Sequence, residues 1–410
     1  MEKVKIGLIG YGNRGRLYSS FIKDHPDDVE YVAICDKRAK SIKKDIEKTG
    51  VKYIFSSVNE FYNANLELDL VLICSMDKYH YKHSLMALSC GYNILLEKPI
   101  SNKLSEVNKL LELSDKKNLK VIVTYVLRYA LFYKKIKEII DSGKIGDVIN
   151  INTTENVGYW HYAHSYIRGN WHDTKETGPM ILTKCSHDMD LIYWLSGKKP
   201  IAVTSFGGRN YLRFEDAPKE SSNFCTDCKY KETCPFNCYY FYYNNKEWLR
   251  PMVGDDLSDE NIKEYLDYSQ YSRCAYKTGA DVVDHQIVNI MFEDGTTCSH
   301  TMNAYTRWCY RDIKIMGTKG CIEGNFENKS FDVYTFNKNV KETVDITKMT
   351  DDFVGHGGGD RIMFNELLDY IKYGTKSVSL TTLEESVISH KLAFMAEKSR
   401  LHEGRIIKLK

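Results

Sequence analysis

The first 125 residues alternate short apolar runs with segments of helical spacing, and this rhythm limits the fold more than any other feature of the chain. The apolar runs are rich in β-branched residues and read VKIGLIG, YVAICD, LDLVLICS, NILLEKP and KVIVTY. Strands that alternate with helices form a parallel sheet that the helices cover. We therefore predict an α/β domain over residues 1–125.

The rhythm stops after Tyr125. A helix-like segment, ALFYKKIKEIIDSGKIG, leads to a polar aromatic stretch, a helix around MILTKCSHDMDLIYWL and the alternating run DHQIVNIMFEDGTTCSHTMNAY. Asp294-Gly295 in that run signals a hairpin and an antiparallel sheet. Because 410 residues are long for one core, we predict a second, α+β domain over residues 126–410, ending in helices near 360–373 and 383–402.

A glycine motif lies where the first strand should meet the first helix. Gly10-Tyr11-Gly12-Asn13-Arg14-Gly15 follows the run KVKIGLI and precedes a helix expected to begin near Asn13. In this arrangement Gly10 allows a tight turn, Gly12 lets the backbone approach a pyrophosphate, and Gly15 lets the helix pack on the strand. The free N–H groups of the helix N-terminus attract an anion. The motif, including Asn13 and Arg14, therefore predicts a dinucleotide site rather than a plain glycine turn.

Asp36 ends the second strand about 20 residues later, where a carboxylate accepts hydrogen bonds from a ribose 2′-hydroxyl. A negative charge there repels a 2′-phosphate, so NAD is the expected cofactor. Lys37 and Arg38 follow at once and leave NADP open as the alternative.

The run NILLEKPIS ends on two charges and one of only seven prolines. In a parallel sheet, ligands bind beyond the carboxyl ends of the strands, so Glu97 and Lys98 should lie at the cofactor edge. Pro99 biases Lys98 toward an extended conformation, which presents both side chains to the cleft. Without the glycine motif, such a pair would more often be solvated surface charge.

Together these motifs resemble the Gfo/Idh/MocA oxidoreductases. The resemblance rests on GLIGYGNRG, Asp36, LICSMDKYHYKHSLMALSCGYNILLEKPIS, YVLRYALFYKKIKEIIDSGKIGDV, HDMDLIYWL, IKIMGTKGCIEG and the closing helices. It implies a Rossmann domain followed by a domain with a large, mainly antiparallel open sheet, through which a homo-oligomer, a dimer or tetramer, would form. It further implies NAD(P)-dependent chemistry on a secondary hydroxyl of a sugar, polyol or sugar derivative. Ser75 and His80 would join Glu97 and Lys98 around the cofactor.

The resemblance implies that Lys98 and His187 are catalytic, and the chemistry agrees. When a hydride leaves a carbinol carbon, the hydroxyl proton must leave too, and a neutral imidazole suits that task near neutral pH. An ammonium group nearby stabilises developing alkoxide charge. His187 is therefore the candidate general acid/base and Lys98 its electrostatic partner. A histidine with no such context would more often be a hydrogen-bonded core residue.

Thr183 departs from the family pattern, in which many members carry an aspartate four residues before the histidine. A threonine holds no negative charge, so it cannot support the basicity of His187 as a carboxylate would. One alternative is therefore a redox-neutral enzyme with tightly bound NAD, in which transient oxidation, elimination and hydration convert a glycoside or anhydro-sugar. A second alternative is an NAD-binding sensor without turnover.

The candidate substrate contacts are residues whose chemistry suits a sugar and whose positions follow the resemblance. An indole and hydrogen-bond donors would come from the segment YIRGNWHDTKETGPM, and His356 precedes a glycine run and Asp360, a candidate helix N-cap. Core packing is the alternative for Trp171 and His356. The full set is Tyr125, Arg168, Trp171, Thr183 and His356.

Four of the twelve cysteines cluster in a region that we interpret as an insertion near residues 215–250. Their spacing, Cys225-x2-Cys228-x5-Cys234-x3-Cys238, can close a tetrahedral zinc site, and a structural zinc would stabilise a segment with little apolar surface. An iron–sulfur cluster and free thiols are the alternatives.

Composition limits the kinds of partner and the cellular location that we expect for the protein. Basic and acidic residues nearly balance, at a net charge of +2, which favours neither nucleic acid nor a membrane surface as a partner. The N-terminus lacks a signal-peptide layout and no apolar run reaches the roughly 20 residues of a membrane helix. We therefore expect a cytoplasmic protein that acts on a small carbohydrate-type substrate, with its cysteines reduced or bound to metal.

Overall fold

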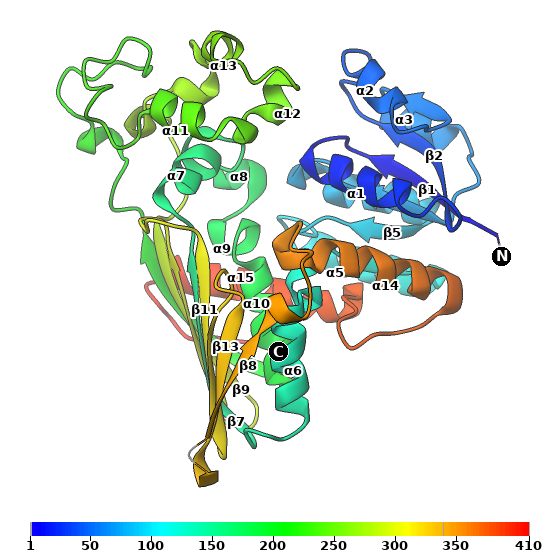
Figure 1. Cartoon of the computed structure of the whole chain (residues 1–410), viewed down its shortest axis with the longest axis vertical. Coiled ribbons are helices and arrows are strands. Elements are labelled where there is room, and N and C mark those ends of the chain that lie inside the picture. The colour runs from blue at the N-terminus through cyan, green and yellow to red at the C-terminus, as the bar shows by residue number, and fades with distance from the viewer. Residues whose placement is uncertain (1, 339, 410) are drawn as a thin grey trace.

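Two sheets organise the chain, as Figure 1 shows for the computed structural model, which describes residues 2–338 and 340–409. The first sheet has six parallel strands in the order β3-β2-β1-β4-β5-β6. Its strands are β1 (Val4–Ile9), β2 (Val29–Cys35), β3 (Tyr53–Phe55), β4 (Leu70–Ile73), β5 (Asn93–Leu96) and β6 (Val121–Val123). Its helices are α1 (Asn13–Lys23), α2 (Lys43–Glu47), α3 (Val58–Asn63), α4 (His80–Ser89) and α5 (Leu104–Lys117). The predicted parallel α/β sheet is confirmed.

The second sheet has nine strands in the order β14-β13-β12-β11-β7-β10-β9-β8-β15. Strands β7 and β10 pair in parallel and the other neighbours are antiparallel, so the predicted mainly antiparallel sheet is also confirmed. The strands are β7 (Val148–Asn156), β8 (Pro200–Gly208), β9 (His285–Phe292), β10 (Thr297–Asn303), β11 (Tyr310–Gly317), β12 (Gly320–Asn325), β13 (Ser330–Thr335), β14 (Val340–Asp345) and β15 (Ile407–Lys408). The Asp294-Gly295 turn joins β9 to β10, as expected.

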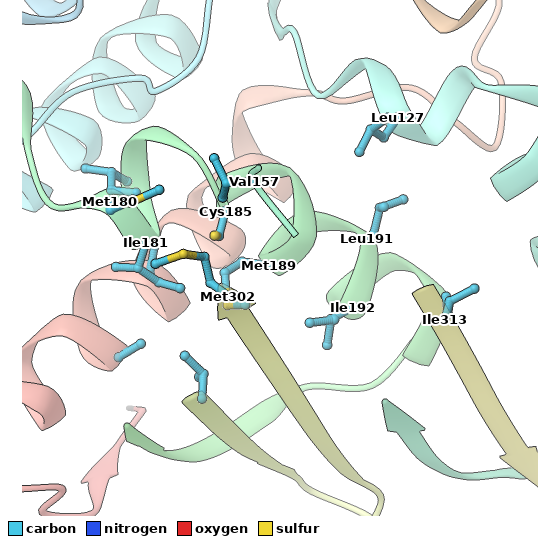
Figure 2. Packing of buried hydrophobic residues seen from close by; sticks show 14 of the residues in the cluster. Leu127, Val157, Met180, Ile181, Cys185, Met189, Leu191, Ile192, Met302 and Ile313 are labelled. Atoms are coloured by element: carbon cyan, nitrogen blue, oxygen red, sulfur yellow. The ribbon is translucent and has the colours of Figure 1, made fainter. Parts of the chain in front are cut away.

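Helices cover one face of this second sheet. They are α6 (Leu131–Asp141), α7 (Tyr159–His161), a π-helical segment η3 (Tyr162–Arg168), α8 (Thr174–Thr177), α9 (Met180–Thr183), α10 (Ser186–Ser196) and α15 (Leu383–Arg400). Figure 2 shows how α10 contributes Met189, Leu191 and Ile192 to the apolar cluster that also contains Met302 of β10. Alternate residues of β10 are buried, which gives this strand a helix-facing side.

The helix predicted around MILTKCSHDMDLIYWL is in fact broken into α9 and α10. The break falls at Lys184 and Cys185, immediately after Thr183, whose carbonyl oxygen accepts a hydrogen bond from the Lys98 ammonium group at 2.7 Å. A lysine from the first domain therefore provides the hydrogen-bond donor for the carbonyl group of the last residue of α9. The chain turns there, and the residues on either side no longer follow one helical period.

The cysteine-rich insertion lies between β8 and β9 and forms a separate lobe at the top of Figure 1. It contains α11 (Cys238–Asn244), α12 (Arg250–Val253) and α13 (Asp259–Leu266). Its own small core combines two of the cysteines with aliphatic and tyrosine side chains: Cys225, Cys238, Tyr242, Leu249, Ile262, Leu266 and Tyr271.

Helix α14 (Gly359–Tyr373) packs against the first sheet, although it follows strands β7 to β14 of the second sheet in the chain. Phe364 of α14 stacks on Tyr18 of α1, with the ring centroids 6.4 Å apart, and Met363 and Leu367 join the same core. The chain thus ties the two domains together next to the glycine motif. Among the described residues, no helix is long and apolar enough to cross a membrane.

Candidate active site

The glycine motif turns as the sequence predicts. Gly10 has φ +96°, and a Cβ there would lie 2.5 Å from the Cys74 carbonyl oxygen, while a Cβ on Gly15 would lie 2.2 Å from the Gly10 carbonyl oxygen. A Cβ on Gly12 would meet no atom within 4 Å. The protein itself therefore needs two of the glycines for packing, and the third leaves open space at the N-terminus of α1. This arrangement fits the pyrophosphate of a dinucleotide.

Asp36 follows β2 and is 7% exposed. Its carboxylate accepts hydrogen bonds from the backbone N–H groups of Tyr11 and Arg38, both at 2.8 Å, and from the Arg38 Nε at 3.2 Å. Burial acts to raise the pKa of Asp36, but the hydrogen bonds and charge of Arg38 outweigh it and lower the pKa. Asp36 is therefore a charged acceptor that also holds the glycine loop, while Asn13 begins α1 and Lys37 lies exposed beside Arg38.

Glu97 turns inward instead of facing the cleft. It is 7% exposed, accepts hydrogen bonds from Arg14 Nε at 2.5 Å and Thr124 Oγ1 at 2.8 Å, and so stays ionised in spite of its burial. Arg14 also bonds Asp360 of α14. Burial acts to raise the pKa of Glu97, but the charge of Arg14 lowers it overall. Glu97 and Arg14 thus form a buried ion network between the domains, which the sequence did not reveal.

Lys98 does reach the junction between the domains. Its Nζ donates to the Thr183 carbonyl oxygen at 2.7 Å, and its backbone N–H donates to Thr124 Oγ1 at 3.1 Å. Burial lowers the pKa of Lys98, while the charge of Asp77 acts in the opposite direction. The side chain of Thr183 is occupied elsewhere, because its hydroxyl lies 3.3 Å from the Pro179 carbonyl oxygen.

His187 lies in the first turn of α10 and is 4% exposed. Its Nδ1 has no hydrogen-bond partner among the described residues. The Tyr125 ring meets it edge-on at 5.9 Å between centroids, and the His356 ring lies 5.4 Å away. Burial, followed by the charge of Lys98, lowers the pKa of His187 far below its usual range. The imidazole is therefore neutral at neutral pH.

The charged side chains on α10, and Lys184 just before it, pair with other residues. Asp188 pairs with Arg311 at 3.0 Å, and Lys184 pairs with Glu155 at 3.1 Å. Asp190, which helical spacing would place on one face with His187, instead forms a buried ion pair with Arg128. None of these charges contacts His187 by a hydrogen bond or ion pair within the described part of the chain.

Tyr125 packs between His187 and His390 in the interior of the protein. It is fully buried, and its hydroxyl bonds His390 Nδ1 at 2.7 Å. The other ring nitrogen of His390 accepts the backbone N–H of Ile100 at 3.1 Å. His390 of α15 thereby fixes the turn that carries Lys98.

Ser75 and His80 hold the same turn from the other side. The ring nitrogens of His80 lie 2.6 Å from the Pro99 carbonyl oxygen and 2.8 Å from the Ser75 carbonyl oxygen. The Ser75 hydroxyl lies 2.9 Å from His83 Nδ1. These contacts join the end of β4 to the turn after β5, at the edge of the sheet where the sequence predicts the cofactor.

Trp171 and Arg168 have different surroundings, although they are close in the sequence. The indole N–H of Trp171 donates to the carboxylate of Asp77 at 2.8 Å, across the junction of the two domains and beside Lys98. Arg168 is instead buried under the cysteine insertion, where it donates to the carbonyl oxygens of Arg273 and Phe236 at 2.7 and 2.6 Å. The structure therefore brings Trp171 to the Lys98 side of the molecule and directs Arg168 away from it.

His356 lies in the turn before α14. Its Nδ1 is 2.8 Å from the Asp360 carboxylate. Asp360 is fully buried, and it is not the helix N-cap, which is Gly358. Sequence reasoning missed Asp77, Asp360 and His390 as parts of this site. The signal for Asp360 was its spacing of four residues from His356; no comparable signal marks the other two.

The predicted metal ligands are only partly gathered. Cys225 and Cys238 are close enough for the Cys238 thiol to lower the pKa of Cys225, and the Arg168 guanidinium lies 3.6 Å from the Cys225 sulfur. Among the described residues, a set of three ligand atoms within 4.8 Å of one another occurs at Cys185, Asp188 and His300, and not at Cys225, Cys228, Cys234 and Cys238.

Comparison with known proteins gives two family matches. Residues 4–125 match the model described as "Oxidoreductase family, NAD-binding Rossmann fold", and residues 137–409 match "Oxidoreductase family, C-terminal alpha/beta domain", both of the Gfo/Idh/MocA group.

The curated relatives carry related names. The putative oxidoreductase YteT of Bacillus subtilis is 26% identical over 317 residues, which cover 73% of this chain and 72% of that protein. The myo-inositol 2-dehydrogenase of Thermotoga maritima is 26% identical over 206 residues, covering 50% of this chain and 58% of the relative.

Solved structures share the fold over the full chain. An oxidoreductase domain protein from Kribbella flavida has a TM-score of 0.77 at 16% identity, with 100% of both chains covered. Levoglucosan dehydrogenase in complex with NADH has a TM-score of 0.75, also at 16% identity and with 100% of both chains covered.

Proposed function

Because the chain belongs to the Gfo/Idh/MocA oxidoreductases, an NAD-binding enzyme family, we propose that it transfers a hydride between NAD and a secondary hydroxyl-bearing carbon of a sugar, polyol or sugar derivative. The relatives named as an inositol dehydrogenase and a glucoside dehydrogenase support this substrate class.

One observation carries the proposal. The ammonium group of Lys98 donates to the Thr183 carbonyl oxygen at 2.7 Å, at the start of the turn that leads to His187, and the charge of Lys98 helps burial to lower the pKa of His187. An ammonium group and a neutral imidazole thus lie near enough at the junction of the domains for the charge of the first to act on the second. Such a pair can accept the hydroxyl proton and stabilise the alkoxide in alcohol oxidation.

In the proposed reaction, Nε2 of His187 takes the proton of the substrate hydroxyl, since burial keeps the ring neutral. The Lys98 ammonium group stabilises the negative charge that develops on that oxygen. NAD, when bound, supplies the acceptor for the hydride. Gly10, Gly12, Gly15 and Asp36 would hold it at the same edge of the sheet as Lys98, because the glycines follow β1, Asp36 follows β2 and Lys98 follows β5 of one parallel sheet.

The remaining assignments belong to the same proposal. Trp171, Tyr125, Thr183 and His356 line or support the substrate side. NAD is favoured over NADP, because the Arg38 guanidinium is already engaged by Asp36. The domain division after residue 125, the oligomer formed through the second sheet and the cytoplasmic location remain predictions.

A panel of polyols, free sugars and glycosides, each with added NAD, tests the function. NADH that accumulates in proportion to the substrate oxidised supports it. A glycoside cleaved with no net NADH and with NAD retained by the protein would assign the redox-neutral reaction instead. Tight NAD binding without turnover of any compound would indicate a sensor.

Two variants test the residue roles on the substrate found. Lys98→Met should lower kcat about 10²- to 10³-fold and leave NAD binding intact, and His187→Gln should behave alike. Lys78→Met is the matched control, because that surface lysine pairs with Glu176 on the same side of the molecule. Wild-type rates in both Lys98→Met and His187→Gln would reject the roles.

Structural zinc at the cysteine insertion is proposed separately. The proximity of Cys225 and Cys238 supports it, because two thiols already share a buried position beside a cation. Metal analysis of purified protein should find one zinc per chain, and Cys228→Ser should lose it. Protein purified without metal and unable to take up added zinc would overturn this prediction.

A further inference from the structure

We propose that His356 and Asp360 form a proton relay, which receives the proton that His187 removes from the substrate and passes it to solvent. The inference rests on the proposed function, because it concerns the proton that accompanies hydride transfer. It extends the role of His356 from a substrate contact to a proton carrier.

The two histidine rings lie side by side at the junction of the domains. Their centroids are 5.4 Å apart, with the ring planes tilted by 50°. His187 is buried, whereas the side chain of His356 is 36% exposed. A proton that moves from the first ring to the second therefore moves from the interior toward water.

Asp360 fixes which nitrogen of His356 takes part. An ionised carboxylate can only accept hydrogen bonds, so His356 Nδ1 must carry the proton that bonds Asp360 at 2.8 Å. The ring then holds its lone pair on Nε2, the nitrogen that is free to accept a proton. A carboxylate orients a catalytic imidazole in the same way in Ser-His-Asp sites.

The charge on Asp360 is itself secured. The carboxylate is fully buried, and burial acts to raise its pKa, but Arg14 and His356 outweigh that effect and lower the pKa. Arg14 in turn bonds Glu97, in the turn that carries Lys98. The relay is thus anchored to the same ion network as the catalytic lysine.

The turn that carries His356 is built to hold it in place. His356 has φ +43°, a left-handed conformation that a non-glycine residue adopts at a cost. The flanking glycines also have positive φ, and their added Cβ atoms would lie 2.4 Å from Asp360 Oδ2 at Gly355 and 2.7 Å from Phe326 at Gly357. The glycine run is therefore packed against the protein rather than open, and it presents one strained histidine to His187.

Few charged groups near the turn are free to interact with His356 in place of His187 and Asp360. His187 faces it from α10, and Asp360 from α14. The segment η2 (Val126–Tyr129) and helix α6 also contact the turn. Their nearby cations have partners of their own, since Arg128 pairs with Asp190 and Glu385, and Lys134 pairs with Glu366.

The relay explains how His187 can lose the proton that it takes from the substrate. Burial and the charge of Lys98 disfavour a proton on His187, so the ring must release each proton before the next turnover. In the forward direction the substrate O–H bond breaks and its proton moves to Nε2 of His187. The hydride leaves the carbinol carbon for NAD with both electrons of the C–H bond. The proton then passes to Nε2 of His356, directly or through one water, and on to solvent.

Removal of the His356 ring tests the relay. His356→Ala should lower kcat about 10- to 100-fold, the range of one proton-transfer step, and added imidazole should restore much of the loss. His356→Gly provides a second variant that tolerates the positive φ and leaves more room for imidazole. His402 is an exposed histidine just after α15, and His402→Ala is the matched control, which should keep the wild-type kcat and show no response to imidazole.

Asp360→Asn gives an independent readout, because an amide cannot hold Nδ1 in the protonated form as a carboxylate does. It should shift the acid limb of the pH–rate profile, whereas His402→Ala should not. Unchanged kcat in both His356 variants would overturn the relay. So would a loss of kcat that imidazole does not restore in variants that bind NAD normally. Hydride transfer by the wild-type protein is measured separately, so failure of the relay leaves the proposed function standing.

Discussion

The substitution Asp190→Asn tests whether Asp190 of helix α10 stabilises the fold or takes part in the reaction. The carboxylate is 1% exposed and accepts two hydrogen bonds from Arg128, both at 2.7 Å, and one from Ser389 at 2.9 Å. Arg128 is also 1% exposed, and its remaining partner, Glu385, is half exposed. The substitution therefore removes the buried negative charge and one of the two acceptors from the Arg128 guanidinium, whose remaining anionic partner among the described residues is the half-exposed Glu385.

The expected cost follows from these contacts. Two charge-assisted hydrogen bonds contribute about 1.5–3 kcal/mol each, and breaking a buried ion pair costs about 3–5 kcal/mol. Because Glu385 keeps part of the pairing, we expect Asp190→Asn to lower the free energy of unfolding by about 3–4 kcal/mol. Turnover per folded molecule should change less than about twofold, since Asp190 makes no contact with His187 among the described residues.

Urea unfolding of the protein without cofactor, followed by circular dichroism, measures this cost. Asp294→Asn is the matched control, because its pair with Lys198 is partly exposed and should contribute under about 1 kcal/mol. Arg128→Met combined with Asp190→Leu should recover part of the loss, since no charge is then left buried alone. Unchanged unfolding together with a large fall in kcat would refute the reasoning and make Asp190 part of the chemistry.

Two further predictions concern the cofactor loop and acid stability. Gly12→Ala should keep the thermal unfolding midpoint but weaken NAD binding in calorimetry, because its Cβ enters open space, whereas Gly10→Ala should lower the midpoint as well, because its Cβ meets Cys74. Burial lowers the pKa of His390 to about 3, so as pH falls below the unfolded value of about 6.5 only the unfolded chain takes the proton, and stability is lost until the folded pKa is reached. Between pH 6.5 and about pH 4.5 the free energy of unfolding should fall by about 3 kcal/mol from this one group. Urea unfolding at these two pH values should show that His390→Gln removes this part of the loss. An equal pH dependence in the variant would contradict the assignment.

The parts of the fold that depend on local pattern could be predicted. The strand runs, the Asp294-Gly295 hairpin and the glycine turn all follow from residues close together in the chain, and the structure contains each of them. Asp36 likewise comes directly after β2, as its spacing from the glycines suggests.

The parts that depend on distant partners could not. Glu97 turns inward because Arg14 and Thr124 receive it, and His390 reaches Ile100 across 290 positions of sequence. Arg168 looked like a sugar contact from its neighbours, yet backbone carbonyls of the insertion hold it. Spacing within one segment carries no information about which segment will pack against it. The same limit applies to the break between α9 and α10, where Lys98 from the first domain donates a hydrogen bond to the Thr183 carbonyl oxygen.

The fate of the carbinol hydrogen tests the central claim most directly. A substrate identified in the panel is prepared with deuterium on the carbon that bears the secondary hydroxyl, and the nicotinamide released after turnover is analysed by mass spectrometry. The account predicts NADH that carries the deuterium, with the transfer slowed in Lys98→Met and His187→Gln. Deuterium that returns to a cleaved product while NAD stays oxidised, or that exchanges with water and never enters the nicotinamide, would contradict it.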